Sequence, residues 1–305
     1  MYYLDFSTSN KNKRYQYLFY IYISVLFIFL CENAQAEFII SLRSPEAIND
    51  QRESYNSELI ALALEKTKSE YGNYTIHNIP PMNTARSIFS LETDVYKNLL
   101  VELSYEEELE RDKNLTYINF PIHLGIVGYR ICFANPRIHE SLKSIQSVGD
   151  LKKFSIGQGL SWADTKVLRH NGFHVIEIGN YESLFKMTIA GRIDLFCRGA
   201  NELFNEYLSH KYMGDLHYDQ SFAIRYTLPR FYYLNKKNVL AKERIEKGLI
   251  AAYKDGSLQK IWLKHFLSGV ELANLKKRKI FTIENPLIKS LPKDYNQYFY
   301  DPLKN

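Results

Sequence analysis

The sequence predicts an α/β protein of two lobes, each a mainly parallel sheet flanked by helices and joined to the other by two crossing strands. Strand-like and helix-like segments alternate from Glu37 onward, which is the pattern of α/β folds. The alternation restarts near Pro136 with its own strands and helices. The segment 222–234 then returns in strand form. This order predicts two units that enclose a cleft.

The first unit follows directly from hydrophobic periodicity. In the helix expected over 54–70, Ile60, Leu64 and Thr67 share one face, which indicates burial. The Pro80-Pro81 pair ends the second strand. Glu106 to Glu110 reads as a solvated helical turn. The strands are expected at 37–42, 74–79, 99–103, 115–121 and 128–134, and a second helix at 83–91.

The second unit has shorter elements, and the chain then returns to the first. Strands are expected at 155–157, 175–178 and 194–197, and helices at 163–170 and 181–190. Two closing helices are expected at 241–254 and 258–266, separated by the cap residues Asp255-Gly256-Ser257. We therefore assign 37–127 and 223–288 to lobe 1, 128–222 to lobe 2, and 289–305 to a loose C-terminal tail.

The first 36 residues predict a secretory signal peptide. Lys11, Lys13 and Arg14 precede an apolar run that is shorter than the roughly 20 residues of a membrane span. Small residues at Ala34 and Ala36 favour cleavage after Ala36. A lipoprotein is disfavoured because the residue before Cys31 is a leucine, where a small side chain is needed. The protein is therefore expected to act outside the cytoplasm.

Composition excludes several functions. A formal net charge of +5 is too mild to predict nucleic-acid binding. Gly157-x-Gly159 lacks the third glycine of a dinucleotide fingerprint, so no cofactor is expected. No metal site is expected, because Asn171-Gly172 breaks the helix between the nearest pair of histidines. Cys132 and Cys197 both lie in apolar runs, where one disulfide and two buried thiols are equally compatible with the sequence.

Four motifs carry a family resemblance over nearly the whole chain after the leader. They are Val148–Lys152, Ser155–Gly159, Tyr181–Leu184 followed by Ala190–Asp194, and Asp255–Trp262. In this order the sequence resembles the type two periplasmic solute-binding proteins, in particular the amino-acid receptors of ABC transporters. The resemblance implies a periplasmic monomer that closes on a small anionic or zwitterionic solute, by hinge motion near 126–130 and 220–226, and serves a membrane permease or a sensor.

The chain departs from those receptors where the ligand is held. Their Thr-x-x-Arg turn is replaced here by Ser104 to Arg111, and their Gly-Thr-Thr turn by Gly159 to Trp162. Their acidic residue after the "aGrvD" strand is replaced by Arg198-Gly199. The sequence therefore predicts ligand contacts that differ from those of the standard receptors.

Arg198 is the leading candidate for a ligand contact. It follows an apolar strand at the carboxyl end of a parallel sheet, the edge where open α/β folds bind ligands. Its guanidinium can bridge Glu202 and a ligand carboxylate or phosphate, or it can form a plain ion pair with Glu202.

Further candidates are weaker. Ser161 and Trp162 open a helix, where free N–H groups favour an anion, but Ser161 can equally be a plain N-cap. Arg86 and Arg130 are also candidate ligand contacts. Alternatively, Arg86 is a solvated helix residue and Arg130 stabilises the crossing between the lobes. Tyr105 and Trp162 can stack on a ligand or serve in packing.

Two other functions remain open. One is a sensory subunit without a transport role. The other is an enzyme on the same fold, a dehydratase or a peptidoglycan-acting protein. The stretch Gly159 to Ala163 falls short of a nucleophile elbow because it lacks the final glycine, so binding without catalysis is the leading hypothesis.

Overall fold

The computed structural model describes residue 20, residues 37–45 and residues 52–304. The expected signal peptide, its cleavage site and Cys31 lie outside the described residues apart from Tyr20. In the described part of the chain, no helix is both long enough and apolar enough to cross a membrane.

The first lobe contains a mixed sheet of five strands in the order β2-β1-β3-β11-β4. β1 runs parallel to β3, whereas β11 is antiparallel to both β3 and β4. The sheet is therefore mixed, because the returning strand β11 runs opposite to its neighbours β3 and β4. The strand bounds are β1 (Phe38–Arg43), β2 (Tyr74–Ile79), β3 (Leu99–Ser104), β4 (Leu115–Tyr117) and β11 (Arg230–Asn235).

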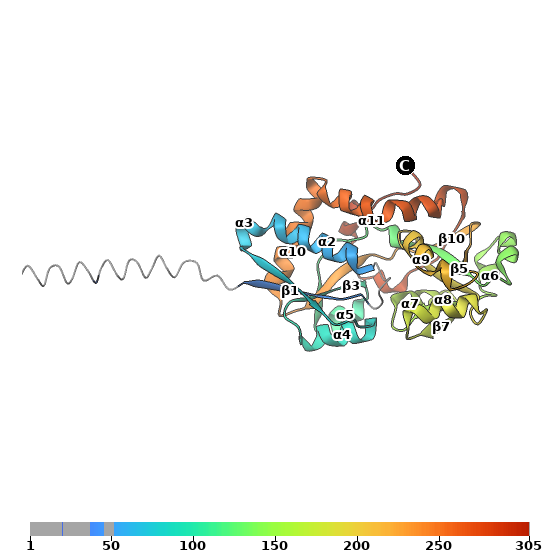
Figure 1. The fold of residues 1–305 in the computed structure, drawn as a ribbon, viewed down its shortest axis with the longest axis horizontal. Coiled ribbons are helices and arrows are strands. Elements are labelled where there is room, and N and C mark those ends of the chain that lie inside the picture. The colour runs from blue at the N-terminus through green and yellow to red at the C-terminus, as the bar shows by residue number, and fades with distance from the viewer. Residues whose placement is uncertain (1–19, 21–36, 46–51, 305) are drawn as a thin grey trace, which may run out of the picture. The chain divides into compact units, whose positions relative to one another are not determined.

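Helices of the first lobe come from both halves of the chain. Figure 1 shows α2 and α10 side by side, although they are far apart in sequence. A Cβ at Gly248 of α10 would lie 2.1 Å from the Ala63 carbonyl oxygen of α2, so this close approach requires a glycine. The bounds are α2 (Arg52–Lys66), α3 (Lys68–Tyr71), α4 (Thr84–Thr93), α5 (Glu107–Asp112), α10 (Val239–Lys254) and α11 (Ser257–Ala273).

The second lobe contains a sheet with the order β12-β10-β5-β8-β6-β7, to which β9 adds by pairing with β5. β6 is parallel to β7 and β8, whereas β5 is antiparallel to β8 and β10. This sheet is also mixed. The bounds are β5 (Tyr129–Ala134), β6 (Ser155–Gly159), β7 (His174–Ile178), β8 (Leu195–Gly199), β9 (His217–Tyr218), β10 (Phe222–Arg225) and β12 (Lys279–Thr282).

Short helices surround the second sheet. α7 and α8 each follow a parallel strand, as a βαβ unit requires. The bounds are η1 (Ile126–Gly128), η2 (His139–Ser144), α6 (Val148–Leu151), α7 (Ala163–His170), α8 (Tyr181–Ile189), α9 (Leu203–His210) and η3 (Lys211–Met213).

Two of the segments that link the lobes lie next to each other. Residues 118–128 connect β4 to β5, and residues 226–229 connect β10 to β11. The Tyr226 N–H donates to the Gly128 carbonyl at 3.1 Å, and a Cβ at Gly128 would lie 2.5 Å from the Tyr226 oxygen. The segment expected as one strand over 222–234 is thus two strands in different sheets. Pro229, which has no N–H to donate, precedes the second of them.

Sheet pairing also moves the expected lobe boundaries. β10 and β12 pair within the second sheet, so 223–225 and 279–282 belong with the second lobe instead of the first. The C-terminal residues are not loose. Leu291 and Tyr295 are buried in the core of the first lobe, and the rings of Tyr298 and Phe120 lie 4.6 Å apart. This part contains η4 (Leu275–Lys277), η5 (Pro286–Ile288) and η6 (Lys293–Tyr298).

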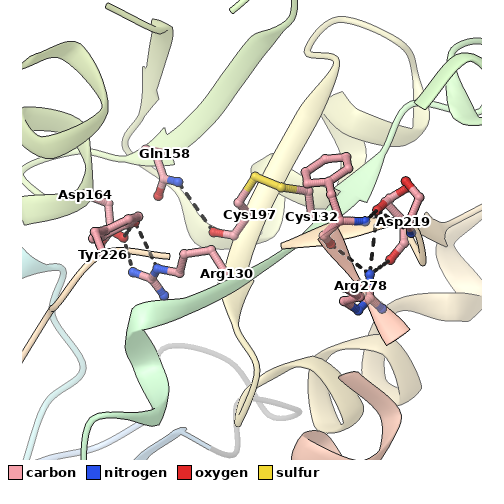
Figure 2. Close-up of a disulfide and its surroundings, with 10 residues drawn as sticks. Arg130, Cys132, Gln158, Asp164, Cys197, Asp219, Tyr226 and Arg278 are labelled. Atoms are coloured by element: carbon pink, nitrogen blue, oxygen red, sulfur yellow. Dashed lines mark hydrogen bonds and ion pairs between the residues drawn. A yellow bond between two sulfur atoms is a disulfide. The ribbon is translucent and has the colours of Figure 1, made fainter. Parts of the chain in front are cut away.

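A disulfide joins the central strands of the second sheet. Cys132 of β5 lies directly opposite Cys197 of β8, and the two are bonded. Figure 2 shows the bridge between two arginine clusters, Arg130 on one side and Arg278 on the other. The sequence left a disulfide and two free thiols open, and the structure contains the disulfide. It ties together the strands that carry Arg130 and Arg198.

Candidate functional site

A cavity lies between the two lobes and is lined by side chains from both. It holds about 1090 Å³ of space, part of it open to solvent, which suits a small solute. The first lobe contributes Arg43, Glu53, Tyr55, Glu102, Ser104, Glu106, His123 and Arg230, among others. The second lobe contributes Ser161, Trp162, Asp164, Tyr181, Arg198, Asn201, Glu202 and Glu206.

Arg198 is at the centre of the second-lobe side. It lies at the end of β8, and its guanidinium donates to both oxygens of Glu206, at 2.8 and 2.9 Å from Nε, and to Glu202. The indole of Trp162 covers the guanidinium, whose carbon lies 4.7 Å from the ring centroid. The Tyr181 hydroxyl donates to Glu206 at 2.8 Å. Arg198 is therefore a buried charge whose Nε and Nη2 groups are paired with carboxylates.

Local sequence explains this arrangement. Glu202 immediately precedes α9 and Glu206 lies one turn further, so both carboxylates face the same side of the helix. The Gly199 N–H donates to Glu202 at 2.8 Å and fixes its position. A Cβ at Gly159 would lie 2.2 Å from the Trp162 ring, so the glycine allows the indole to pack over the end of β6.

Arg130 forms a second buried cluster behind the cavity wall. Figure 2 shows its guanidinium beside Asp164 and Tyr226. Arg130 Nε donates to the Tyr226 hydroxyl at 3.0 Å, another guanidinium N–H donates to Asp164, and the Tyr226 hydroxyl also donates to Asp164. Arg130 Nη1 lies 3.6 Å from Glu202, which links this cluster to that of Arg198.

Glu102 organises the first-lobe side. It projects from β3, accepts from Arg230 of the adjacent strand β11 at 2.6 Å and lies 3.0 Å from His123 Nε2. Its second oxygen accepts from Asn56 of α2 at 3.0 Å. Nearby, Arg43 donates to Glu53 at 2.8 Å. Each carboxylate on this side has a cationic or amide partner.

Several contacts connect the two lobes across the cavity, among them an ion pair between Arg230 and Glu202 at 3.9 Å. Lys166 of α7 donates to Glu106 at 2.5 Å and to Glu108 on the opposite lobe. Asn201 Nδ2 lies 3.1 Å from His123 Nδ1. These contacts hold the two lobes around the cavity.

The carboxylates differ in their electrostatic environment. Burial acts to raise the pKa of Glu102, but His123 and Arg230 outweigh it and hold that pKa well below its ordinary value. For Asp164, burial is likewise outweighed by Arg130 and Arg230, so its pKa is lowered.

The pKa values of Glu202 and Glu206 shift in opposite directions. Burial acts to raise the pKa of Glu202, but Arg198, Arg230 and Arg130 together lower it. Burial raises the pKa of Glu206 and the nearby Glu202 charge adds to this effect, although Arg198 opposes both. Burial also raises the pKa of Glu106 despite its contact with Lys166. Glu206 and Glu106 are thus the carboxylates that the site neutralises least well.

Three buried polar atoms of cavity-lining residues lack a hydrogen-bond partner among the described residues. One is His123 Nε2, which still lies 3.0 Å from a Glu102 oxygen. The other two are the Oδ1 acceptor of Asn201, a side chain that is 1% exposed, and the Nε donor of Arg230. Since an unpaired buried polar group is costly, a cavity that keeps one acceptor and one donor free is suited to a ligand with groups of both kinds.

The structure brings together four of the seven residues singled out from the sequence. Arg198, Glu202, Ser161 and Trp162 all line the cavity. Ser161 does so without capping α7. Its φ is +62°, in the left-handed region, and the N-cap position belongs to Trp162, which makes no side-chain cap bond. The expected N-cap role of Ser161 is therefore wrong.

The other three residues are not among those lining the cavity. Arg86 is exposed on α4. Arg130 is buried behind the wall and contacts Tyr226 of the second crossing. Tyr105 packs in the first-lobe core at 5.4 Å from the Tyr117 ring.

Sequence reasoning missed several residues of the site. Glu206 was detectable, because it repeats the position of Glu202 one helical turn later. Asp164 was also detectable as an acidic residue in the first turn of α7. Glu102, His123 and Arg230 gave no such signal, because they come from separate segments that only the fold brings together.

The fold and the two-sided cavity define the class. Two mixed α/β sheets, joined by adjacent crossings and enclosing a cavity, form the fold of type II periplasmic binding proteins, with which the similar solved structures agree. No protein-family model and no curated protein matches the chain.

Solved structures similar to this chain bind amino acids. An arginine-specific periplasmic binding protein from Salmonella typhimurium has a TM-score of 0.58 at 10% identity, over 76% of this chain and 100% of that one. The GluR0 ligand-binding core from Nostoc punctiforme, in complex with L-glutamate, has a TM-score of 0.55 at 16% identity, over 75% and 99%.

A third similar structure belongs to a transport system. It is an amino acid ABC transporter substrate-binding protein from Streptococcus pneumoniae bound to L-arginine, with a TM-score of 0.54 at 14% identity, over 76% of this chain and 94% of that one. At these identities the likeness concerns the fold, and the ligand must be argued from this chain's own residues.

Proposed function

We propose that this protein is a periplasmic binding protein that closes its two lobes over a small amino-acid-like zwitterion and delivers it to an ABC-type permease. The free Asn201 Oδ1 acceptor and the free Arg230 Nε donor carry the proposal, because an ammonium would satisfy the first and a carboxylate the second. Their positions in a cavity lined by both lobes support ligand-induced closure.

The role of Arg198 changes in this proposal. The N–H groups on Nε and Nη2 of Arg198 are directed at Glu206 and Glu202, so they already have partners within the protein. We assign Arg198, with Trp162 over it, to the wall that orders these two carboxylates. Ser161 and Glu202 remain proposed contacts at the cavity surface.

The proposal is tested by a thermal-shift screen. The full chain is expressed with its own N-terminal segment, and the exported protein is purified. The probes are amino acids, amines, organic acids, sugars and phosphate compounds, since a ligand of the folded state raises the unfolding midpoint. We expect a shift from amino acids and none from sugars or phosphates.

Asn201→Ala separates a specific contact from general damage. It should reduce the ligand-induced shift while leaving the midpoint of the free protein within a few degrees, because it removes one hydrogen bond to His123. Arg86→Ala, on an exposed side chain away from the cavity, is the control and should bind normally. A shift that survives Asn201→Ala would contradict the assigned site.

Transport and catalysis are tested separately. A strain lacking the protein should take up the identified amino acid more slowly, whereas unchanged uptake would favour a sensory role. Incubation of the protein with that ligand, followed by mass spectrometry, should return it unmodified. A product would contradict binding without turnover.

A further inference from the structure

The charges around the cavity are unequal. Six carboxylates line it, those of Glu53, Glu102, Glu106, Asp164, Glu202 and Glu206. Three arginines line it, Arg43, Arg198 and Arg230. Arg130 and Lys166 add two more cations by pairing with Asp164 and Glu106, but Lys166 is shared with Glu108. Carboxylates therefore outnumber the cations that neutralise them.

The histidines at the cavity compensate little of this excess. His210 and His265 lie beside carboxylates outside the lining, Glu182 and Glu58, at 3.2 and 2.8 Å. Only His123 lies beside a lining carboxylate, Glu102, which already has Arg230 as its partner. On the second lobe, Asp164, Glu202 and Glu206 share Arg130 and Arg198, and Arg230 of the first lobe lies 3.9 Å from Glu202.

A second observation points to the same kind of ligand. Asn201 Oδ1 is buried and has no hydrogen-bond partner among the described residues. A Cβ at Gly199 would lie 2.5 Å from this atom and 2.9 Å from Glu202 Oε2, so both acceptors converge over the same glycine. An N–H donor of a ligand satisfies such a pair, whereas an anion is repelled by it.

Metal ions are a poor match for this arrangement. Across the residues that the structure describes, no group of three or more His, Cys, Asp or Glu side chains is placed to hold one. Glu202 and Glu206 are both bonded to Arg198, which lies between them. Carboxylates arranged in this way suit an organic cation that donates hydrogen bonds in several directions.

We infer that the natural ligand carries a net positive charge, as an amino-acid-like solute with an additional ammonium or guanidinium group, and that Glu206, Glu202 and Asn201 select it. The inference rests on the proposed function and narrows the ligand class. Arg230 would hold the carboxylate on the first lobe, and the carboxylate excess of the second lobe would face the cationic group.

The experiment compares matched probes by isothermal titration calorimetry. L-Arginine and L-citrulline differ in the charge of the terminal group, as do L-lysine and L-norleucine, and L-glutamate carries the opposite charge. We expect at least one cationic probe to bind about tenfold or more tighter than its neutral partner, and L-glutamate not to bind.

Glu206→Gln tests the assigned residue. It preserves the shape of the side chain and the contact with Arg198 but removes one charge, so it should lower the cationic-to-neutral affinity ratio by about tenfold. Glu107→Gln removes the same charge from an exposed position on α5 outside the cavity and should leave the ratio unchanged. The ratio distinguishes charge recognition from loss of structure.

The outcomes distinguish failure of the charge inference, failure of the assignment to Glu206 and failure of the proposed function. Equal or tighter binding of citrulline, norleucine or glutamate would overturn the charge inference and leave the proposed binding function standing. An unchanged ratio in Glu206→Gln would overturn the assignment to this residue. If none of these probes binds and no compound in the thermal-shift screen raises the unfolding midpoint, the proposed function itself is wrong.

Discussion

The two walls of the cavity handle buried charge differently. On the first lobe, Glu102 is surrounded by Arg230, His123 and Asn56, and its pKa lies well below its ordinary value. On the second lobe, Glu206 has Arg198 and Tyr181 as partners but shares Arg198 with Glu202, and its pKa is raised. Glu102 on the first wall has several partners of its own, whereas Glu206 on the second wall shares its arginine with another carboxylate.

This difference indicates that the two walls have different roles. A fully paired network is rigid, because each group is oriented by several others. A network with surplus charge is costly to bury and is stabilised when a ligand supplies the missing cation. We therefore expect the first wall to maintain the shape of the cavity and the second to respond to the ligand.

The largest effect is expected from Arg198→Met. It leaves Glu202 and Glu206 buried without their common cation, which should lower the free energy of unfolding by about 3–5 kcal/mol. Urea denaturation of the free protein measures this loss. Arg86→Met, on an exposed side chain, should change it by less than about 0.5 kcal/mol. Equal effects in the two variants would refute a structural role for Arg198.

A smaller loss is expected from Arg230→Met on the other wall. Glu102 loses one partner but keeps Asn56 and His123, so the free energy of unfolding should fall by about 1–3 kcal/mol. The same urea experiment applies. A loss as large as that of Arg198→Met would mean that Asn56 and His123 do not compensate for the missing arginine. The two walls would then not differ in the way described above.

The pH dependence of Glu206→Gln sharpens the contrast between the walls. Because burial raises the pKa of Glu206 in the folded state, the folded protein holds a proton that the unfolded chain releases as pH rises above the ordinary glutamate value. Wild-type stability should therefore decline relative to the variant over the interval from that value up to the raised pKa.

Unfolding midpoints at a series of pH values measure the effect. The difference between Glu206→Gln and wild type should grow with pH through this interval. Glu102→Gln should behave in the opposite way, because the lowered pKa of Glu102 gives a stabilisation that is present above the ordinary value and lost in acid. Parallel curves for the two variants would remove the distinction between the walls.

The smallest effect is expected from Lys166→Gln, which removes the contact of α7 with Glu106 and Glu108 on the other lobe. Lys166 is partly exposed, so the free energy of unfolding should change by less than about 1 kcal/mol, and the change should shrink in high salt. Denaturation at low and high salt tests this, and a salt-independent loss would show that the contact is not chiefly electrostatic.

Local sequence determined much of the fold. The helix over 163–170 and the strand over 74–79 are confirmed with the expected bounds, because hydrophobic periodicity and turn residues act over short distances. Phe222–Arg225 and Arg230–Asn235 were predicted as strand, but their membership in different sheets was not. Pairing between distant strands depends on the partners available, which local residues do not specify.

The site divides along the same line. Arg198, Glu202 and Trp162 were identified because each lies at a strand end or a helix start, positions that the sequence marks. The sequence could not show that Arg198 pairs with Glu206, nor that Glu102, His123 and Arg230 of the other lobe line the same cavity. Charge balance in a cleft depends on which groups meet in three dimensions, and only the tertiary structure decided that.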